Sequence, residues 1–229
     1  MDNDTCLPFT RLCFKNRFLY LLVFLLLMIA LDPLDAVLGK FGILADLVTS
    51  AILVLAIYAV SHKRHHVVIG VLLAVPMVVS LWSHVFGEYK WLQITGHVCG
   101  MVFFAFIIVA ILKFISSQDE ITRDLIAGAA VVYLFVAALW AFSYTLIEMI
   151  HPGSFSIPPA GQSAGHRVNF MYYSLVTLTT LGYGDITPAT GVAKVCSTLE
   201  AVIGQLYLVI TVAWLVGIHV SQSIEQKSR

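Results

Sequence analysis

The chain has 229 residues, of which 59% are hydrophobic and 11% charged, and its mean hydropathy is +0.91. This composition lies far outside the range of soluble domains and predicts a polytopic membrane protein. Formal net charge is zero, so no basic surface suggests a nucleic-acid partner. The four cysteines lack metal-site spacing. No nucleophile–base set or metal tetrad stands on a loop, so an enzyme is not expected.

The first half of the chain predicts four membrane helices, separated by short polar turns. They cover residues 18–31, 41–60, 67–86 and 91–112. The first run is short for a span of about 20 residues, and we expect it to end at Asp32-Pro33. The alternative is a cleaved signal peptide, but no clean small-residue cleavage site follows the run.

The second half predicts two further membrane helices around a short one. A span at 121–150 precedes a loop rich in Pro, Gly and Ser at 151–168, which we expect to be flexible. Residues 169–179 suit a short re-entrant helix, and 192–220 form the sixth span. The predicted organisation is a cytoplasmic N-terminus, a four-helix unit, a pore domain and a cytoplasmic tail: 1–17, 18–115, 116–220 and 221–229.

Basic residues predict the orientation of these helices. With both termini in the cytoplasm, nine Lys and Arg residues lie inside and four outside, as the positive-inside rule requires. The inside set is Arg11, Lys15, Arg17, Lys63, Arg64, Lys113, Arg123, Lys227 and Arg229; the outside set is Lys40, Lys90, Arg167 and Lys194. The fourth span, 91–112, contains no Lys or Arg, so it lacks the gating charges of a voltage sensor.

The most informative stretch is Thr180-Leu181-Gly182-Tyr183-Gly184-Asp185, which follows Thr177-Leu178-Thr179. Glycine adopts positive φ without steric cost, so glycines at alternate positions let successive carbonyls turn to one side. A strip of such carbonyls replaces the hydration shell of a cation, as in the Thr-Val-Gly-Tyr-Gly filter of potassium channels. Leu181 stands in place of the valine.

On these residues, 169–219 resembles the pore of a potassium channel, and the wider chain resembles the short bacterial six-helix members of the ion-channel superfamily. The resemblance implies an all-α membrane protein with a permeant K⁺ ion and no cofactor. The expected filter residues are Thr180, Leu181, Gly182, Tyr183 and Gly184, with the backbone of the first four as K⁺ ligands. One strip cannot enclose an ion, so a homotetramer in membrane lipid is expected.

The resemblance also implies a shell of residues that supports the filter from behind: Tyr172, Tyr173, Thr179, Asp185 and Glu200. Tyrosines replace the tryptophans common in the family, and we expect their hydroxyls to reach Asp185. The alternative is that they are aromatic residues of the membrane interface. Glu200 is an intramembrane carboxylate, for which we expect a hydrogen bond to a pore-helix hydroxyl or a protonated acid.

The sixth span carries the predicted gate and cavity lining: Gly204, Gln205, Leu208, Val212 and Val216. In the family that the chain resembles, a glycine at this place lets the inner helix bend. The alternative is a close helix–helix contact through a small residue. The apolar stripe suits a dewetting constriction, but Ile203, Leu206 and Val209 would line the pore instead if the helix were rotated.

Polar residues elsewhere carry weaker hypotheses. His62, His65 and His66 flank Lys63 and Arg64 in a short turn, which favours a solvated positive loop near anionic lipid over a metal cluster. Asp46, His84 and His97 lie near the outer ends of their spans. Interfacial solvation is the expected role of these three, and a metal or proton site is the alternative.

We therefore expect a passive potassium-selective channel in a bacterial inner membrane, without voltage gating by arginines. The alternatives are a poorly selective cation channel and a potassium transporter or regulatory subunit. Tyr183 argues against the first, since the non-selective form of this filter lacks the aromatic residue. A single complete pore loop argues against the transporter, which carries four loops in one chain. No motif predicts the gating stimulus.

Overall fold

The structure, a computed structural model, describes residues 16–38, 42–61, 64–83, 89–118, 121–157 and 170–227. The regular secondary structure of the described chain is helical except for one pair of two-residue strands. In chain order its elements are α2 (Arg17–Leu38), α3 (Gly42–Ala59), α4 (Arg64–Leu81), α6 (Lys90–Ser116), α7 (Arg123–Ile150), β1 (Phe155–Ser156), α8 (Phe170–Leu178), β2 (Thr187–Pro188) and α9 (Gly191–Lys227). The predicted all-α fold is confirmed.

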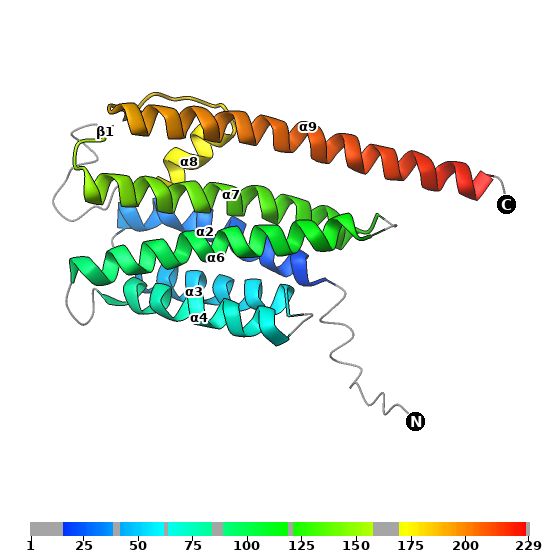
Figure 1. The fold of residues 1–229 in the computed structure, drawn as a ribbon, viewed down its shortest axis with the longest axis horizontal. Helices are drawn as coiled ribbons and strands as arrows, with labels where there is room; N and C mark the ends of the chain where they lie inside the picture. The colour runs from blue at the N-terminus through cyan, green and yellow to red at the C-terminus, as the bar shows by residue number, and fades with distance from the viewer. Residues whose placement is uncertain are drawn as a thin grey trace.

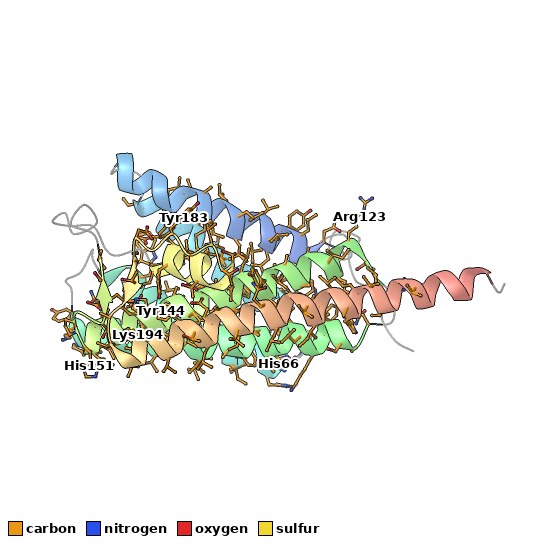
Figure 2. The ribbon with its side chains drawn as sticks, turned by 90° about the horizontal axis from the view of Figure 1, so that it is seen from above. His66, Arg123, Tyr144, His151, Tyr183 and Lys194 are labelled. Carbon is orange, nitrogen blue, oxygen red and sulfur yellow. The ribbon has the colours of Figure 1, made fainter. Side chains whose placement is uncertain are left out.

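The five helices from α2 to α7 form a bundle, and the short helix α8 lies between α7 and α9 (Figure 1). Helix α9 runs along α7 and extends past the end of the bundle. The beginning of α2 and the end of α9 lie at the same end of the molecule. Arg123 and His151 mark the two ends of α7, and Tyr183 lies toward the His151 end (Figure 2).

Four of the described helices are long and apolar enough to cross a membrane, namely α4, α6, α7 and α9 as far as Ile218. Helices α2 and α3 contribute the shorter apolar stretches Arg17–Leu31 and Ile43–Ala59. The chain is thus a multi-pass membrane protein, and a total of exactly six spans remains a prediction.

The core of the bundle lies where α6 packs between α4 and α7. Phe103, Ile107 and Ile111 of α6 and Phe135 of α7 are fully buried, and the Phe104 and Phe135 rings meet at 5.3 Å. These positions are three or four residues apart, so they form one face of each helix. This packing joins the four-helix unit to the first helix of the pore unit.

A second junction ties α2 to the beginning of α7. Asp124 accepts hydrogen bonds from the backbone N–H groups of Phe18 at 3.0 Å and Leu19 at 3.2 Å. A carboxylate at this position satisfies donors that the first turn of α2 leaves without helical partners. The Arg17 guanidinium lies over the Phe114 ring, 4.4 Å from its centroid. The first turn of α7 therefore holds the beginning of α2 in place.

Three predicted boundaries were wrong. Helix α2 does not end at Asp32-Pro33 but continues to Leu38, and α4 likewise contains Pro76; apolar helices tolerate proline where neighbouring groups satisfy the freed carbonyl. Helix α4 already begins at Arg64, so His65 and His66 are helical rather than in a loop. Helix α9 continues to Lys227, because residues 221–227 contain no Gly or Pro to stop it.

Candidate functional site

The backbone after α8 alternates between two conformations. Thr180, Gly182 and Gly184 have φ angles of 59°, 62° and 77°, and the residues between them do not have positive φ. Such an alternation brings successive peptide carbonyls to one side of an extended strip, which is the geometry of a cation filter. The glycines predicted two of the three positions. Thr180 was not foreseen, because a left-handed conformation costs a residue with a Cβ about 1–2 kcal/mol.

The base of this strip is anchored to the last turn of α8. The carbonyl of Val176 accepts from the N–H groups of Leu181 at 2.9 Å and Gly182 at 3.3 Å, and Thr180 N–H donates to Thr177 O at 3.0 Å. These bonds satisfy carbonyls that the end of a helix leaves without partners. The negative end of the helix dipole lies beside the strip and favours a cation there.

Asp185, at the outer end of the strip, is held by α8. Tyr172 Oη donates to Asp185 Oδ2 at 2.8 Å, and the N–H of Ile186 donates to Asp185 Oδ1 at 3.0 Å. The phenol is the donor in this pair, because a carboxylate oxygen only accepts. Tyr173 does not reach Asp185; its hydroxyl pairs with Ser197 of α9 at 2.6 Å.

The turn between α7 and β1 supports the segment that follows the filter. Glu148 accepts from the N–H groups of Gly153 at 2.7 Å and Phe155 at 3.1 Å. Strand β1 then pairs antiparallel with β2, with Phe155 opposite Pro188. The predicted flexible loop is therefore ordered over 151–157, and residues 158–168 lie outside the described part of the chain.

Glu200 joins three helices behind the filter. Its carboxyl group is fully buried. Tyr144 of α7 donates to its Oε2 at 2.6 Å, and its Oε1 pairs with the Ser174 hydroxyl of α8. Ser174 also donates to the carbonyl of Ala137 at 2.8 Å. One hydroxyl proton cannot serve two acceptors, so both Ser174 contacts are hydrogen bonds only when Glu200 supplies a proton.

Two further tyrosine hydroxyls, which the sequence did not single out, hold the pore unit together. Tyr133 Oη of α7 donates to Leu178 O at 3.1 Å, directly before the filter. Tyr207 Oη of α9 donates to Ala129 O at 2.7 Å. A tyrosine in the middle of an apolar helix needs a hydrogen-bond partner when buried, and that rule was the signal available for both.

Gly204 lies where α9 comes closest to the end of α8. A Cβ on Gly204 would lie 2.5 Å from Leu178 O, so only glycine fits at this contact. This supports the close-contact interpretation, while bending at Gly204 remains a prediction. Helix α9 exposes both predicted stripes in the single chain: Gln205, Leu208, Val212 and Val216, and equally Ile203, Leu206 and Val209. Which stripe lines the pore therefore stays a prediction.

The filter strip itself is uncovered within one chain. Every residue from Thr179 to Asp185 is exposed, and Tyr183 keeps 67% of its side-chain surface. Thr179 bonds only its own helix, its Oγ1 donating to Leu175 O at 2.7 Å. The predicted filter segment is therefore open on one side and backed by α8 on the other.

The histidines show no metal site in the part of the chain that the structure describes, where no three metal-binding side chains come together. His66 packs its ring against Phe106 at 5.6 Å. His97 lies against Phe142 at 5.2 Å. His62 and His84 fall outside the described residues.

The comparison with protein families points to the same segment of the chain. Residues 122–219 match a family model described as "Ion channel". The chain is 43% identical over 75 residues to "Two pore potassium channel c" of Oryza sativa subsp. japonica, which covers 31% of this chain and 15% of the rice protein. It is 28% identical over 80 residues to "Potassium channel protein kcv" of Paramecium bursaria Chlorella virus 1, which covers 35% of this chain and 83% of the viral protein.

No solved structure matches the chain. The family match and the two relatives support a potassium-channel family, and the family match covers the pore unit. The helices before the pore unit, and the activity of the whole protein, are interpreted from the chain's own residues.

Proposed function

We propose that the chain is one subunit of a homotetrameric, potassium-selective channel that conducts passively across the membrane. The observation that carries the proposal is the alternation of positive φ at Thr180, Gly182 and Gly184 on the end of α8. Four such strips around an axis would offer rings of carbonyl oxygens in place of water. Irregular backbone at membrane depth is tolerated where it lines such a water-filled path.

In this proposal the K⁺ ligands are the backbone carbonyls of Thr180, Leu181, Gly182 and Tyr183, and no side-chain charge is needed among them. Neutral dipoles bind each ion weakly, so ions move between adjacent sites. Tyr172 and Asp185 hold the outer end of the strip, and Glu200 and Ser174 hold α8 against α9. These supporting roles belong to the proposal.

The surroundings of the pore complete the proposal. Both termini lie in the cytoplasm, as the excess of Lys and Arg on that side favours, and the membrane is a bacterial inner membrane. Because the span at α6 has no Lys or Arg between Trp91 and Leu112, we expect little voltage dependence. A potassium transporter or regulatory subunit, and a poorly selective channel, are the alternatives.

The test is ion flux into liposomes that contain the purified full-length chain. We expect potassium flux well above sodium flux, lost in Tyr183→Ala. Tyr20→Ala is a matched control, because Tyr20 is 51% exposed on α2 and lies far from the filter in the sequence. Equal potassium and sodium flux would show a poorly selective channel. No flux from the tetrameric protein in any condition would favour a regulatory subunit.

A further inference from the structure

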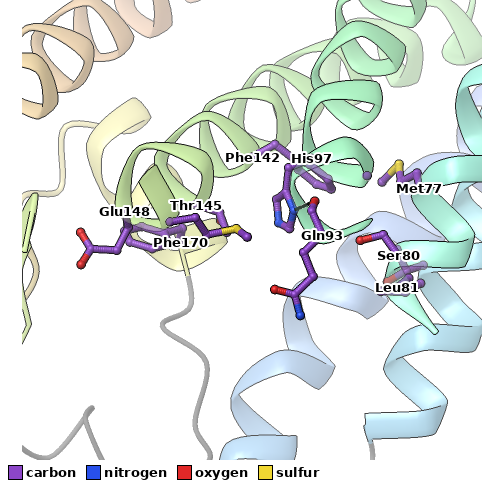
Figure 3. Close-up of a pocket in the computed structure, with 12 residues that line it drawn as sticks. Met77, Ser80, Leu81, Gln93, His97, Phe142, Thr145, Glu148 and Phe170 are labelled. Atoms are coloured by element: carbon purple, nitrogen blue, oxygen red, sulfur yellow. Dashed lines mark hydrogen bonds between the residues drawn. The ribbon is translucent and has the colours of Figure 1, made fainter. Parts of the chain in front are cut away.

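A cavity of about 420 Å³ lies between the four-helix unit and the pore unit. Helices α3, α4 and α6 form one side, and α7 and the first residue of α8 form the other. Figure 3 shows Gln93 and His97 of α6 between the α7 and α8 residues on one side and those of α4 on the other. Cavities of this size at the boundary between two units are where small molecules bind.

The polar groups of the cavity come from a few positions. The His97 Nδ1 lies 2.7 Å from Gln93 O. A carbonyl only accepts, so Nδ1 carries the proton in this contact. Thr145 Oγ1 donates to Ala141 O at 2.8 Å, which leaves its oxygen an acceptor. The Gln93 amide offers both donors and an acceptor. A ligand hydroxyl suits this set.

The rest of the described lining is largely apolar and aromatic. Phe142, Phe170 and Met77 supply much of the apolar wall. The Glu148 carboxylate is engaged by two backbone N–H groups, and in Figure 3 it extends away from His97. No Lys or Arg is among the lining residues that the structure describes. An anionic ligand would find no counter-ion among these residues, and a cationic ligand would find only a carboxylate that is already engaged, so a neutral ligand is favoured.

Size narrows the ligand further. An apolar cavity of about 150 Å³ is enough for benzene, so about 420 Å³ has room for two rings. We propose that this cavity, between His97, Phe142, Thr145 and Phe170, binds a neutral two-ring compound that carries a hydroxyl group, and that its occupancy raises conduction through the filter.

Two contacts connect the cavity to the filter, and this second half of the inference rests on the proposed function. Phe170 begins α8, and its ring packs against Phe155 at 5.0 Å. Glu148 holds the turn before β1, which pairs with β2 directly after the filter. A ligand in contact with Phe170 would add contacts at the beginning of α8, and a ligand in contact with Met149 would add them at the end of α7. Both contacts stabilise the position of α8.

Binding is tested first, with 2-naphthol and the full-length protein in nanodiscs, by equilibrium dialysis with empty nanodiscs subtracted. We expect saturable binding that is lost in Thr145→Phe, which fills the cavity. Thr145→Val removes the hydroxyl acceptor of the cavity, so it should weaken 2-naphthol binding several-fold and should leave naphthalene binding unchanged. Val98→Phe is the matched control, because Val98 is the next residue of α6 and is 44% exposed. Equal binding to wild type and Thr145→Phe would overturn the site.

Potassium flux with and without 2-naphthol tests the coupling. We expect a several-fold rise in wild type and in Val98→Phe, and none in Thr145→Phe. A conducting wild type that binds 2-naphthol with no change in flux would overturn the coupling. A protein that binds 2-naphthol but never conducts would support the ligand site and contradict the proposed channel function, so the two failures are distinguishable.

Discussion

Helices α7 and α9 are alike in length and apolar character within the membrane and differ in how the chain packs them. Each offers a 28-residue span. Of the most apolar 18 residues of α7, 61% are buried within the chain, against 6% for α9. Helix α7 is surrounded by other helices of its own chain. Helix α9 is buried against the rest of the chain along one stripe only, which includes Ala193, Ser197, Glu200 and Gly204.

This difference indicates that α7 is part of the core of the single chain, whereas most of α9 is available for contact with lipid or with other subunits. Lipid tolerates exposed apolar side chains, so the bare face of α9 is not by itself a sign of assembly. The filter beside it is different, because its backbone carbonyls need partners that lipid cannot provide. The exposed face of α9 lies next to an exposed polar backbone segment. We therefore expect other copies of the chain to cover both.

The largest effect is expected at the contact between α9 and α8. In Gly204→Ala the new Cβ meets the Leu178 carbonyl at 2.5 Å, and overpacking of this kind costs about 1–3 kcal/mol in each subunit. We expect loss of the tetramer and of potassium flux, measured by size-exclusion chromatography and liposome assay. Gly217→Ala in the same helix meets nothing within 4 Å and should be neutral or stabilising. Equal behaviour of the two variants would contradict the described packing.

Glu200 tests the link between α9 and α7. Glu200→Ala leaves the Tyr144 hydroxyl without its buried acceptor, at a cost of about 1–3 kcal/mol. It also removes the contact with Ser174, whose hydroxyl still donates to the Ala137 carbonyl. Glu200→Gln donates to Ser174 and accepts from Tyr144, as the protonated acid does. We expect the Gln variant to keep the thermal stability of the wild type and the Ala variant to lose it.

Infrared spectroscopy of the wild type should show an undissociated carboxylic acid band that the Gln variant lacks. If the Gln variant is as unstable as the Ala variant, Glu200 is ionised in the folded protein.

A smaller effect is expected on the bare face of α9. Val209 is 66% exposed in the single chain, and Val209→Trp should weaken the tetramer if neighbouring subunits or the narrow pore cover this face. Leu72→Trp is the matched change on α4, where Leu72 is 72% exposed, and it should leave the assembly intact. Chromatography in mild detergent compares the two. An intact tetramer in Val209→Trp would place that face against lipid.

The smallest effect is expected at the outer end of the filter. Tyr172→Phe removes the hydrogen bond to Asp185, worth about 1 kcal/mol, and keeps the ring. We expect potassium flux to fall several-fold with the fold and the assembly unchanged. Tyr20→Phe is the matched control, and it should leave the flux, the fold and the assembly unchanged. Unaltered flux in Tyr172→Phe would mean that Asp185 is held by its backbone contact alone.

The sequence predicted the helices better than their connections. Apolar runs located every described long helix, because membrane helices satisfy their own backbone groups and need little else. Helix ends were missed at Pro33 and beyond Val220, where local stop signals were overridden or absent. The positive φ angles at Gly182 and Gly184 were predicted, whereas the left-handed Thr180 depends on the bonds to Thr177 and Val176. The hydrogen bond between Glu200 and a pore-helix hydroxyl was predicted, and Ser174 supplies it. Tyr144 was missed because its role depends on a contact between distant segments.

The central claim is that one chain supplies one quarter of a filter. Native mass spectrometry of the full-length protein, released from nanodiscs that contain potassium, tests it most directly. We predict a mass of four chains, and a return to smaller species in Gly204→Ala but not in Gly217→Ala. A wild type that remains a single chain would contradict the account, because one strip of carbonyls cannot surround an ion.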